Sequence, residues 1–349
     1  MFNNFPLWSL ILIYLVLAGG IVFFSKKLAD YVDALDKKTK ISGAFIGAVL
    51  LAAVTSLPEL FTSISATILI DDGADLVIGN ILGSNLFNLA IIGVALILFY
   101  KLFSRSNIEY KTQYIVITAC LLIFGIVGYG ILAPSSAQPI VGPINFLAIL
   151  IFVIYGVAIF LEPKSKDDEE EEKEDPLKEL SVKQVIIRFA FFAVLLVVTS
   201  IFITYVTDSL SAQLFNGDDT IAGAIFLAIA TSLPELTSTF VLCKKGNFNA
   251  ALGDITGSCL FNFLIIGLAE LMSFRISLLG GYDIARYRSA IIMLIAAVVV
   301  FIVLLVTLII KNIAIKKEKG ENKIRNIFYI CSGVIITAGY FVFLILSNI

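Results

Sequence analysis

One six-residue stretch, Thr-Ser-Leu-Pro-Glu-Leu, occurs twice in this chain and constrains its fold more than any other feature. The copies cover 55–60 and 231–236, and each lies inside a long apolar segment. A second block follows each copy, 79–88 in the first half and 253–262 in the second. The copies are offset by 176 residues at their glutamates and by 174 at the asparagines that close the second blocks. Two halves of the chain therefore carry the same kinds of polar residue in the same order.

The apolar segments around these blocks are long enough to cross a bilayer as helices. Charged residues make up 15% of the sequence, against about 25% in soluble domains. Apolar stretches of roughly 20 residues, the length of a membrane-spanning helix, recur ten times. We place them near 7–24, 42–70, 76–100, 113–133, 142–161, 185–207, 220–243, 248–272, 289–310 and 326–348. These runs are too long and too continuously apolar for the strands of a membrane β-barrel.

The sequence therefore predicts an all-α polytopic membrane protein. The first apolar segment lacks the basic start and small-residue cleavage pattern of a signal peptide, so we interpret it as a retained helix. Taken in alternation, the connections on one side of the membrane hold 22 Lys and Arg residues and those on the other side hold 3. Basic connections face the cytoplasm, so we expect both termini outside. With five helices in each half, the halves enter from opposite sides, as inverted repeats do.

The domain boundaries follow from one change in composition. Residues 163–183 form an acidic segment between the halves that includes Asp167 to Asp175, and we interpret it as a cytoplasmic linker. The first five-helix repeat is then 1–162, with its signature block at about 45–93. The second is 184–349, with its block at about 221–267. A solvated, mobile loop is the first interpretation of the linker, because blocks of like charge are usually disordered. Regulatory calcium binding is the alternative, although the linker lacks the spacing of an EF-hand loop.

Residue types that are missing exclude several functions. The chain has no histidine, which rules out a Ser-His or Cys-His catalytic pair and a histidine metal site. Its four cysteines fall in predicted helices without metal-ligand spacing, so we expect small core residues. Paired aspartates of an aspartyl protease are not mirrored between the halves. We expect a protein that is not an enzyme and needs no cofactor.

The repeated blocks supply the ligands of a hard cation. A glutamate inside a membrane-length helix is costly and marks a functional site, and Glu59 and Glu235 occupy equivalent places. If the halves pack as a pseudo-twofold pair, hydroxyls, amides and backbone carbonyls converge on these carboxylates. Ca²⁺ takes about 6–8 oxygen ligands with carboxylates among them. The residues that could contribute are Thr55, Ser56, Ser84, Asn88, Thr231, Ser232, Ser258 and Asn262.

Two features of the pattern set the expected behaviour of the site. Without a cation the two buried carboxylates would repel each other, and one would tend to hold a proton. Ca²⁺, Na⁺ and protons could therefore compete for it, as an antiporter requires. Pro58 and Pro234 have no backbone N–H, so we expect each helix to bend there and to free the carbonyls of Val54 and Ala230. Single Ser, Thr and Asn residues could instead serve only in helix contacts.

The paired Thr-Ser-Leu-Pro-Glu and Gly-Ser-X-X-Phe-Asn blocks resemble the α-repeats of the calcium/cation antiporter superfamily, particularly its sodium/calcium exchanger branch. The resemblance implies a fold of two inverted five-helix repeats and export of Ca²⁺ against Na⁺ at sites between the second, third, seventh and eighth helices. It implies Glu59 and Glu235 as central ligands, joined by Ser84 and Ser258. By the same resemblance, further ligands through hydroxyls or carbonyls would be Ala52, Thr55, Ser56, Ala228, Thr231 and Ser232.

Departures from the superfamily pattern leave alternatives open. Asn88 and Asn262 stand where some members have Asp, which argues against potassium dependence. Asp254 is an additional carboxylate in place of the first half's Asn80, and we consider it either a neighbour of the site or a relay for protons or Na⁺. Ca²⁺/H⁺ exchange, exchange of another divalent ion and a cation channel remain alternatives. We expect a multi-pass protein of the plasma membrane for which a monomer suffices, with no nucleic-acid partner.

Overall fold

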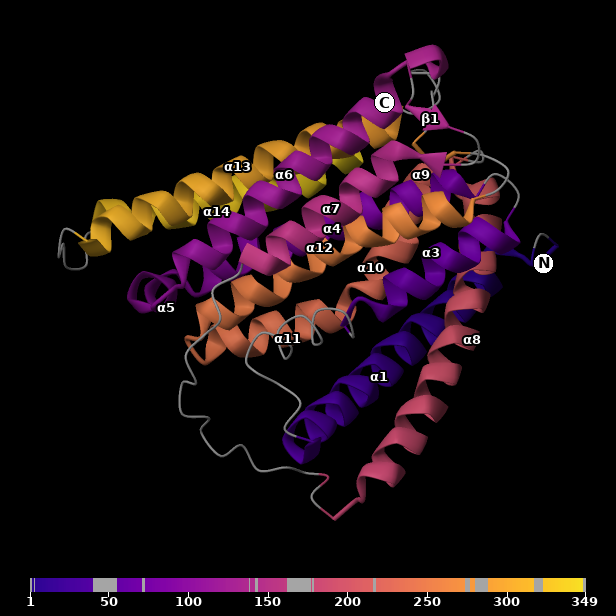
Figure 1. The fold of residues 1–349 in the computed structure, drawn as a ribbon, viewed down its shortest axis with the longest axis horizontal. Coiled ribbons are helices and arrows are strands. Elements are labelled where there is room, and N and C mark those ends of the chain that lie inside the picture. The colour runs from indigo at the N-terminus through magenta and orange to yellow at the C-terminus, as the bar shows by residue number, and fades with distance from the viewer. Residues whose placement is uncertain are drawn as a thin grey trace.

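The structure is a computed structural model that describes residues 2, 4–39, 55–70, 73–137, 139–141, 144–161, 177, 179–215, 218–273, 277–279, 288–316 and 323–347. Within these ranges the chain is almost entirely helical, as predicted from the long apolar runs (Figure 1). The predicted ligand Ala52, the carbonyl of Val54 and most of the linker at 163–183 lie outside the described residues.

The first half contains six α-helices and one short hairpin among its described residues. Its helices are α1 (Leu7–Thr39), α3 (Leu57–Leu69), α4 (Ala74–Leu98), α5 (Tyr100–Arg105), α6 (Tyr110–Leu132) and α7 (Phe146–Leu161), with a 3₁₀ turn at Ser135–Ala137. The hairpin pairs β1 (Ile140–Val141) with β2 (Ile144–Asn145) in antiparallel register.

The second half repeats the pattern without a hairpin among its described residues. Its elements are α8 (Val182–Leu214), α9 (Asp219–Ala222), the π-helix η2 (Gly223–Leu227), α10 (Ala228–Thr231), α11 (Leu233–Lys244), α12 (Phe248–Met272), α13 (Arg288–Lys316) and α14 (Lys323–Ser347).

Seven of the described helices are long and apolar enough to span a membrane. The segments Asp219–Thr231 and Leu233–Lys244, bent by 50° at their junction, make an eighth if they are one span. Helices α3 and α7 are apolar but shorter, and the start of the predicted span at 42–70 lies outside the described residues. Together with the family assigned below, these helices establish an integral, multi-pass membrane protein.

Several predicted boundaries were wrong. Helix α1 continues past residue 24 to Thr39, where a charged connection was predicted. It stays helical because Tyr31 and Ala34 are buried against Val185 of α8. Helix α7 begins at Phe146 rather than 142, since β1 and β2 occupy the preceding residues. The connection predicted at 101–112 contains the short helix α5.

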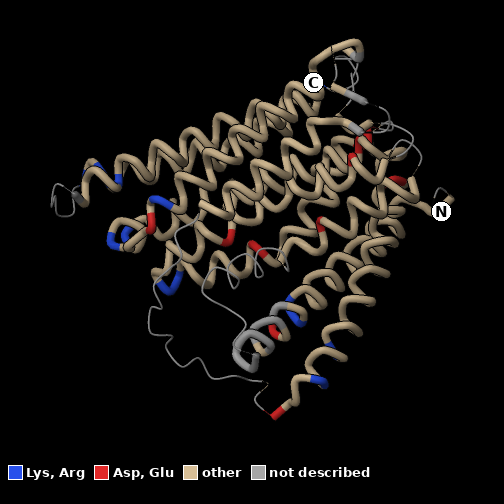
Figure 2. The backbone as a smooth tube through the Cα atoms, viewed as in Figure 1, with Lys and Arg blue, Asp and Glu red and all other residues tan. Residues whose placement is uncertain are grey.

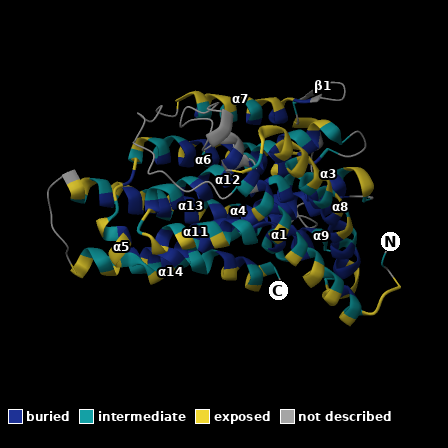
Figure 3. Cartoon of the chain, turned by 90° about the horizontal axis from the view of Figure 1, so that it is seen from below, coloured by how far each residue is buried: buried dark blue, intermediate teal, exposed yellow. Residues whose placement is uncertain are grey.

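The helices form a packed centre between two outer groups. In the apolar stretch that could span the membrane, 78% of the residues of α4 and 67% of those of α12 are buried. The buried share is only 17% for α1 and 22% for α8. Helices α1 and α8 pack on each other along one side of the molecule, and α13 and α14 lie on the other (Figure 1). Exposed positions follow the outer faces of the helices (Figure 3). They include large apolar side chains such as Trp8 and Phe160, as a lipid-facing surface requires.

Helix α4 crosses α9 and η2 with the backbones in contact. A Cβ atom added to Gly79 would lie 2.2 Å from the carbonyl oxygen of Thr220, and one added to Gly223 would lie 2.6 Å from that of Leu76. Small residues allow membrane helices to approach this closely. Gly79 on α4 and Gly223 on η2 therefore allow this helix to pack closely against the second half of the chain.

Charged side chains are distributed unevenly along the bundle. Many of the described Lys and Arg residues lie towards the end that carries α5, whereas acidic residues gather near the end where the chain termini lie (Figure 2). A few acidic residues lie inside the bundle, away from both ends (Figure 2). Of the four cysteines, three are buried as expected, but Cys331 on α14 is exposed, so its assignment to the core was wrong.

Candidate cation site

The two glutamates of the repeated stretch occupy equivalent turns at the start of α3 and α11. Each helix begins directly after a serine with nearly the same backbone angles, φ −90° and ψ 10° at Ser56 and φ −91° and ψ 8° at Ser232. A proline stands in the first turn of each helix, where no helical partner for its nitrogen is needed. Glu59 and Glu235 therefore lie in the first turns, where the helix dipole favours negative charge.

Both carboxylates are completely buried and meet hydroxyl groups. The Ser232 hydroxyl donates to Oε1 of Glu59 over 3.0 Å, which joins the two halves directly. The Ser258 hydroxyl donates to Oε1 of Glu235 over 3.4 Å. Thr231 and Ser84 also interact with the Glu59 carboxylate, and Thr55 interacts with Glu235. The charges of the two glutamates are close enough to interact.

Two further contacts are mirror images of each other. Ser84 of α4 and Thr231 of α10 have their hydroxyl oxygens 3.4 Å apart. The equivalent residues Ser258 of α12 and Thr55 are also 3.4 Å apart. In each pair, a serine from the second block of one half meets a threonine from the first block of the other. The polar residues of the two halves thus converge with pseudo-twofold symmetry around Glu59 and Glu235.

Several oxygen atoms of the predicted ligands are buried without a hydrogen-bond donor among the described residues. They are Oε2 of Glu59, Oε2 of Glu235, Oγ of Ser56, Oδ1 of Asn88 and Oδ1 of Asn262. Leaving such a group unsatisfied costs about 1–3 kcal/mol, and more when it is charged. Oxygen atoms with two carboxylates among them suit a hard cation of the Ca²⁺ or Na⁺ type.

The described residues contain no cluster of three or more His, Cys, Asp or Glu side chains that could hold a metal. A site of two carboxylates and neutral oxygen donors would not form such a cluster.

Sequence reasoning missed Asn85, which lies beside the cluster on α4. Its Oδ1 accepts a hydrogen bond of 2.9 Å from Nδ2 of Asn262, and its backbone oxygen accepts one of 3.8 Å from the Cys259 thiol. Asn85 is adjacent to Ser84 on α4, so it points to a different side of the helix from Ser84 and Asn88. The difference between Asn85 and its counterpart Cys259 was the signal that could have identified it.

Two predicted ligands have other neighbours. Ala228 is buried on α10, but its backbone oxygen already accepts hydrogen bonds from the Ser232 amide over 3.1 Å and from the Thr231 hydroxyl over 3.4 Å. Asp254 lies one turn before Ser258 on α12 and contacts the hydroxyls of Ser238 and Thr239.

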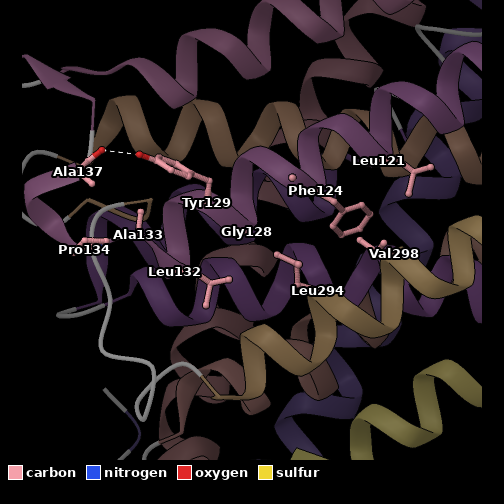
Figure 4. Close-up of a pocket in the computed structure, with 11 residues that line it drawn as sticks. Leu121, Phe124, Gly128, Tyr129, Leu132, Ala133, Pro134, Ala137, Leu294 and Val298 are labelled. Atoms are coloured by element: carbon pink, nitrogen blue, oxygen red, sulfur yellow. Dashed lines mark hydrogen bonds between the residues drawn. The ribbon is translucent and has the colours of Figure 1, made fainter.

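An open pocket of about 640 Å³ lies away from this cluster, between α6 and α13. Its walls are mostly apolar, and Tyr129 at its rim donates a hydrogen bond to the backbone oxygen of Ala137 (Figure 4). Phe124 and Leu121 line it from α6 and Val298 lines it from α13 (Figure 4). It lacks the carboxylates that a cation site needs.

The chain is similar to known membrane exchangers. The family model described as "Sodium/calcium exchanger protein" matches residues 8–162 and 184–348. The "Sodium/calcium exchanger MaX1" of Methanosarcina acetivorans is 26% identical over 74% of this chain and 82% of its own length. The solved H⁺/Ca²⁺ exchanger CAX superposes with a TM-score of 0.64 over 97% of this chain and 90% of its own, at 15% identity. A structure of the sodium-calcium exchanger NCX_Mj gives 0.53 over 96% of both chains, at 18% identity.

Proposed function

Because this chain belongs to the sodium/calcium exchanger family, we propose that it is a secondary active antiporter that exchanges Ca²⁺ for Na⁺ across the membrane. Members of this family are membrane exchangers, so the chain is a transporter of cations. The choice of Ca²⁺ and Na⁺ is the proposal.

One observation carries the proposal most directly: Glu59 and Glu235 are both completely buried, and Ser232 of the second half donates to Glu59 of the first. Two carboxylates balance the charge of one Ca²⁺. Each also keeps one oxygen atom without a donor among the described residues. The same pair, with its hydroxyl neighbours, would equally accept Na⁺ ions in place of Ca²⁺. Competition for shared oxygen atoms is what couples the two ions in opposite directions.

The ligand set follows from the contacts around the glutamates. Ser84, Ser258, Thr55 and Thr231 would supply hydroxyl oxygens from the two mirrored pairs. The remaining oxygen atoms would come from the side chains of Ser56, Ser232, Asn88 and Asn262. Ala52 and Ala228 would contribute backbone oxygens when the helices bend.

We also propose the arrangement in the membrane. The chain would cross ten times as two inverted repeats, 1–162 and 184–349, with both termini outside and the linker at 163–183 in the cytoplasm. A plasma membrane location fits export of Ca²⁺. Alternating access would come from movement of α1 and α8, which pack on each other and carry no proposed ligand. Among the candidate membrane-spanning helices, these two have the smallest share of buried residues.

We propose Na⁺ rather than the proton as the counter-ion because neutral hydroxyl and amide oxygens surround the two carboxylates. Such groups bind Na⁺ but add no further site for a proton. The fold is also similar to that of the H⁺/Ca²⁺ exchanger CAX. Proton coupling is therefore the alternative that an experiment has to distinguish from Na⁺ coupling.

The experiment is ⁴⁵Ca²⁺ uptake by the purified protein in liposomes, with Na⁺, K⁺ and pH gradients imposed one at a time. We expect uptake to require an outward Na⁺ gradient. We expect Glu59→Gln and Glu235→Gln to reduce it to background while the protein keeps its thermal stability. Glu109→Gln is the matched control, because Glu109 is an exposed carboxylate at the start of α6.

Three outcomes would reject the proposal or part of it. Uptake driven by a pH gradient without Na⁺ would replace Na⁺ coupling by proton coupling. Uptake that follows the Ca²⁺ gradient alone, with no counter-ion, would indicate a channel. Normal Na⁺-driven uptake in either glutamine variant would reject the site itself.

A further inference from the structure

Asp254 forms a second polar cluster with two hydroxyl groups on the neighbouring helix α11. Its Oδ2 accepts hydrogen bonds from Ser238 and, over 3.5 Å, from Thr239. The side chain is 8% exposed, and its other oxygen, Oδ1, is buried without a donor among the described residues. A buried carboxylate of this kind takes up a proton or binds a compensating positive charge.

The first half of the chain has a neutral residue at the position equivalent to Asp254. Asn80 is the counterpart of Asp254, and Thr62 and Ser63 are the counterparts of Ser238 and Thr239. Nδ2 of Asn80 lies 3.0 Å from the Thr62 hydroxyl and 2.9 Å from the Ser63 hydroxyl. A neutral amide therefore satisfies these hydroxyls, so helix packing alone does not need a carboxylate here.

The described part of the chain offers no ion pair to neutralise Asp254. Asp254 and Glu235 are acidic neighbours whose negative charges repel each other. With Glu235 nearby and no basic partner among the described residues, the Asp254 side chain is stable here either with a proton or with a cation bound beside it. The oxygen atoms at hand are one carboxylate and two hydroxyls, which together suit a singly charged hard cation.

We infer that Asp254, Ser238 and Thr239 form an additional Na⁺ site, separate from the paired glutamates and present only in the second half of the chain. The inference rests on the proposed exchange and deepens it, because Na⁺ is the counter-ion there. Asp254 precedes Ser258 by four residues, which places the two about 6 Å apart along the axis of α12. The Na⁺ at Asp254 lies on the side of the glutamates where α11 and α12 connect.

This placement gives the site a role in the exchange cycle. A Na⁺ bound at Asp254 reduces the repulsion that Glu235 experiences from that carboxylate, so it favours loading of the central pair. The first half, with Asn80, has no such charge. Na⁺ binding is therefore asymmetric between two halves that are otherwise mirrored at the central site.

Equilibrium binding of ²²Na⁺ to the purified full-length protein in detergent tests the inference without requiring transport. We expect Asp254→Asn to bind about one Na⁺ fewer per chain, because the buried charge that it neutralises is gone. The variant should fold, since Asn80 makes the equivalent contacts. Binding of ⁴⁵Ca²⁺ without Na⁺ should stay within about twofold of wild type, a change of less than 1 kcal/mol.

Paired hydroxyl variants add an independent measurement. Ser238→Ala with Thr239→Val should weaken the binding of that Na⁺ by about tenfold or more, equal to at least 1.4 kcal/mol. Thr62→Val with Ser63→Ala is the matched control, because it removes the equivalent hydroxyls beside Asn80 and should leave Na⁺ binding unchanged.

Unchanged ²²Na⁺ stoichiometry in Asp254→Asn would overturn the inference, and so would an equal loss in the Thr62 and Ser63 control. Failure of the proposed exchange has a different signature. In that case wild type would show no Na⁺-driven ⁴⁵Ca²⁺ uptake in liposomes, whatever the number of Na⁺ ions bound in detergent.

Discussion

The crossing of α4 and α9 makes a sharp prediction for Gly79→Ala. The added methyl group would lie 2.2 Å from the carbonyl oxygen of Thr220 and 2.9 Å from its carbonyl carbon. Both atoms belong to the backbone, so no side chain can rotate away. The helices can accommodate the methyl group only by moving apart.

The size of the effect follows from two opposing contributions. Overpacking of a well-packed interior costs about 1–3 kcal/mol, and we expect the upper end because the clash is with backbone. Alanine gains about 1 kcal/mol over glycine within a helix. The net destabilisation is therefore about 2 kcal/mol. Displacement of α4 also moves Ser84, whose hydroxyl is 3.4 Å from Thr231 at the cation site, so exchange should fall along with stability.

The assay is thermal unfolding of the purified protein in detergent, combined with Na⁺-driven ⁴⁵Ca²⁺ uptake in liposomes. Gly125→Ala on α6 is the control, because no described atom lies within 4 Å of its added Cβ. We expect Gly125→Ala to unfold at the wild-type temperature or above it, and Gly79→Ala to unfold several degrees lower with slower uptake. Equal unfolding temperatures for the two variants would refute the reasoning about the backbone contact.

Two further substitutions test buried charges that hold the structure together. Lys311 is buried on α13 and its ammonium donates to the backbone oxygens of Ser106 over 2.7 Å and Ser104 over 3.3 Å, so Lys311→Met should destabilise the protein by about 2 kcal/mol in thermal unfolding. If Lys311→Met unfolded at the wild-type temperature, the hydrogen bonds of Lys311 would make no net contribution to stability. Glu270 on α12 accepts hydrogen bonds from the Ser277 hydroxyl over 2.5 Å and the Leu279 amide over 3.0 Å. Replacement of Glu270 by leucine should cost about 1–3 kcal/mol and increase hydrogen exchange at Leu279, and unchanged exchange there would contradict this role.

The helical fold was predictable because its signal is local and strong. Long apolar runs separated by charged or glycine-containing turns gave a predicted segment that overlaps each described helix of fifteen residues or more, although the ends of α1 and α8 were predicted too short. The errors came from tertiary packing. The end of α1 is charged in sequence, and only the contact of Tyr31 and Ala34 with Val185 of α8 explains why it remains helical.

The candidate site was predictable as a set of residues but not as a geometry. The repeat identified Glu59 and Glu235, and symmetry suggested that they meet. Nothing in the sequence showed that Ser232 would donate to Glu59 across the halves, while Ser258 donates to Glu235 within one half. Asn85 was missed for a related reason, since its partner Asn262 lies far along the chain. That these residues bind cations remains a prediction.

The bond between Ser232 and Glu59 also has a consequence for biosynthesis. Its two residues are separated by 173 positions in the chain. At about 5–20 residues per second, the ribosome needs roughly 10–35 s to make the intervening segment. A newly inserted N-terminal half must therefore keep Glu59 hydrated, or shielded by the insertion machinery, until the later helices arrive to enclose it.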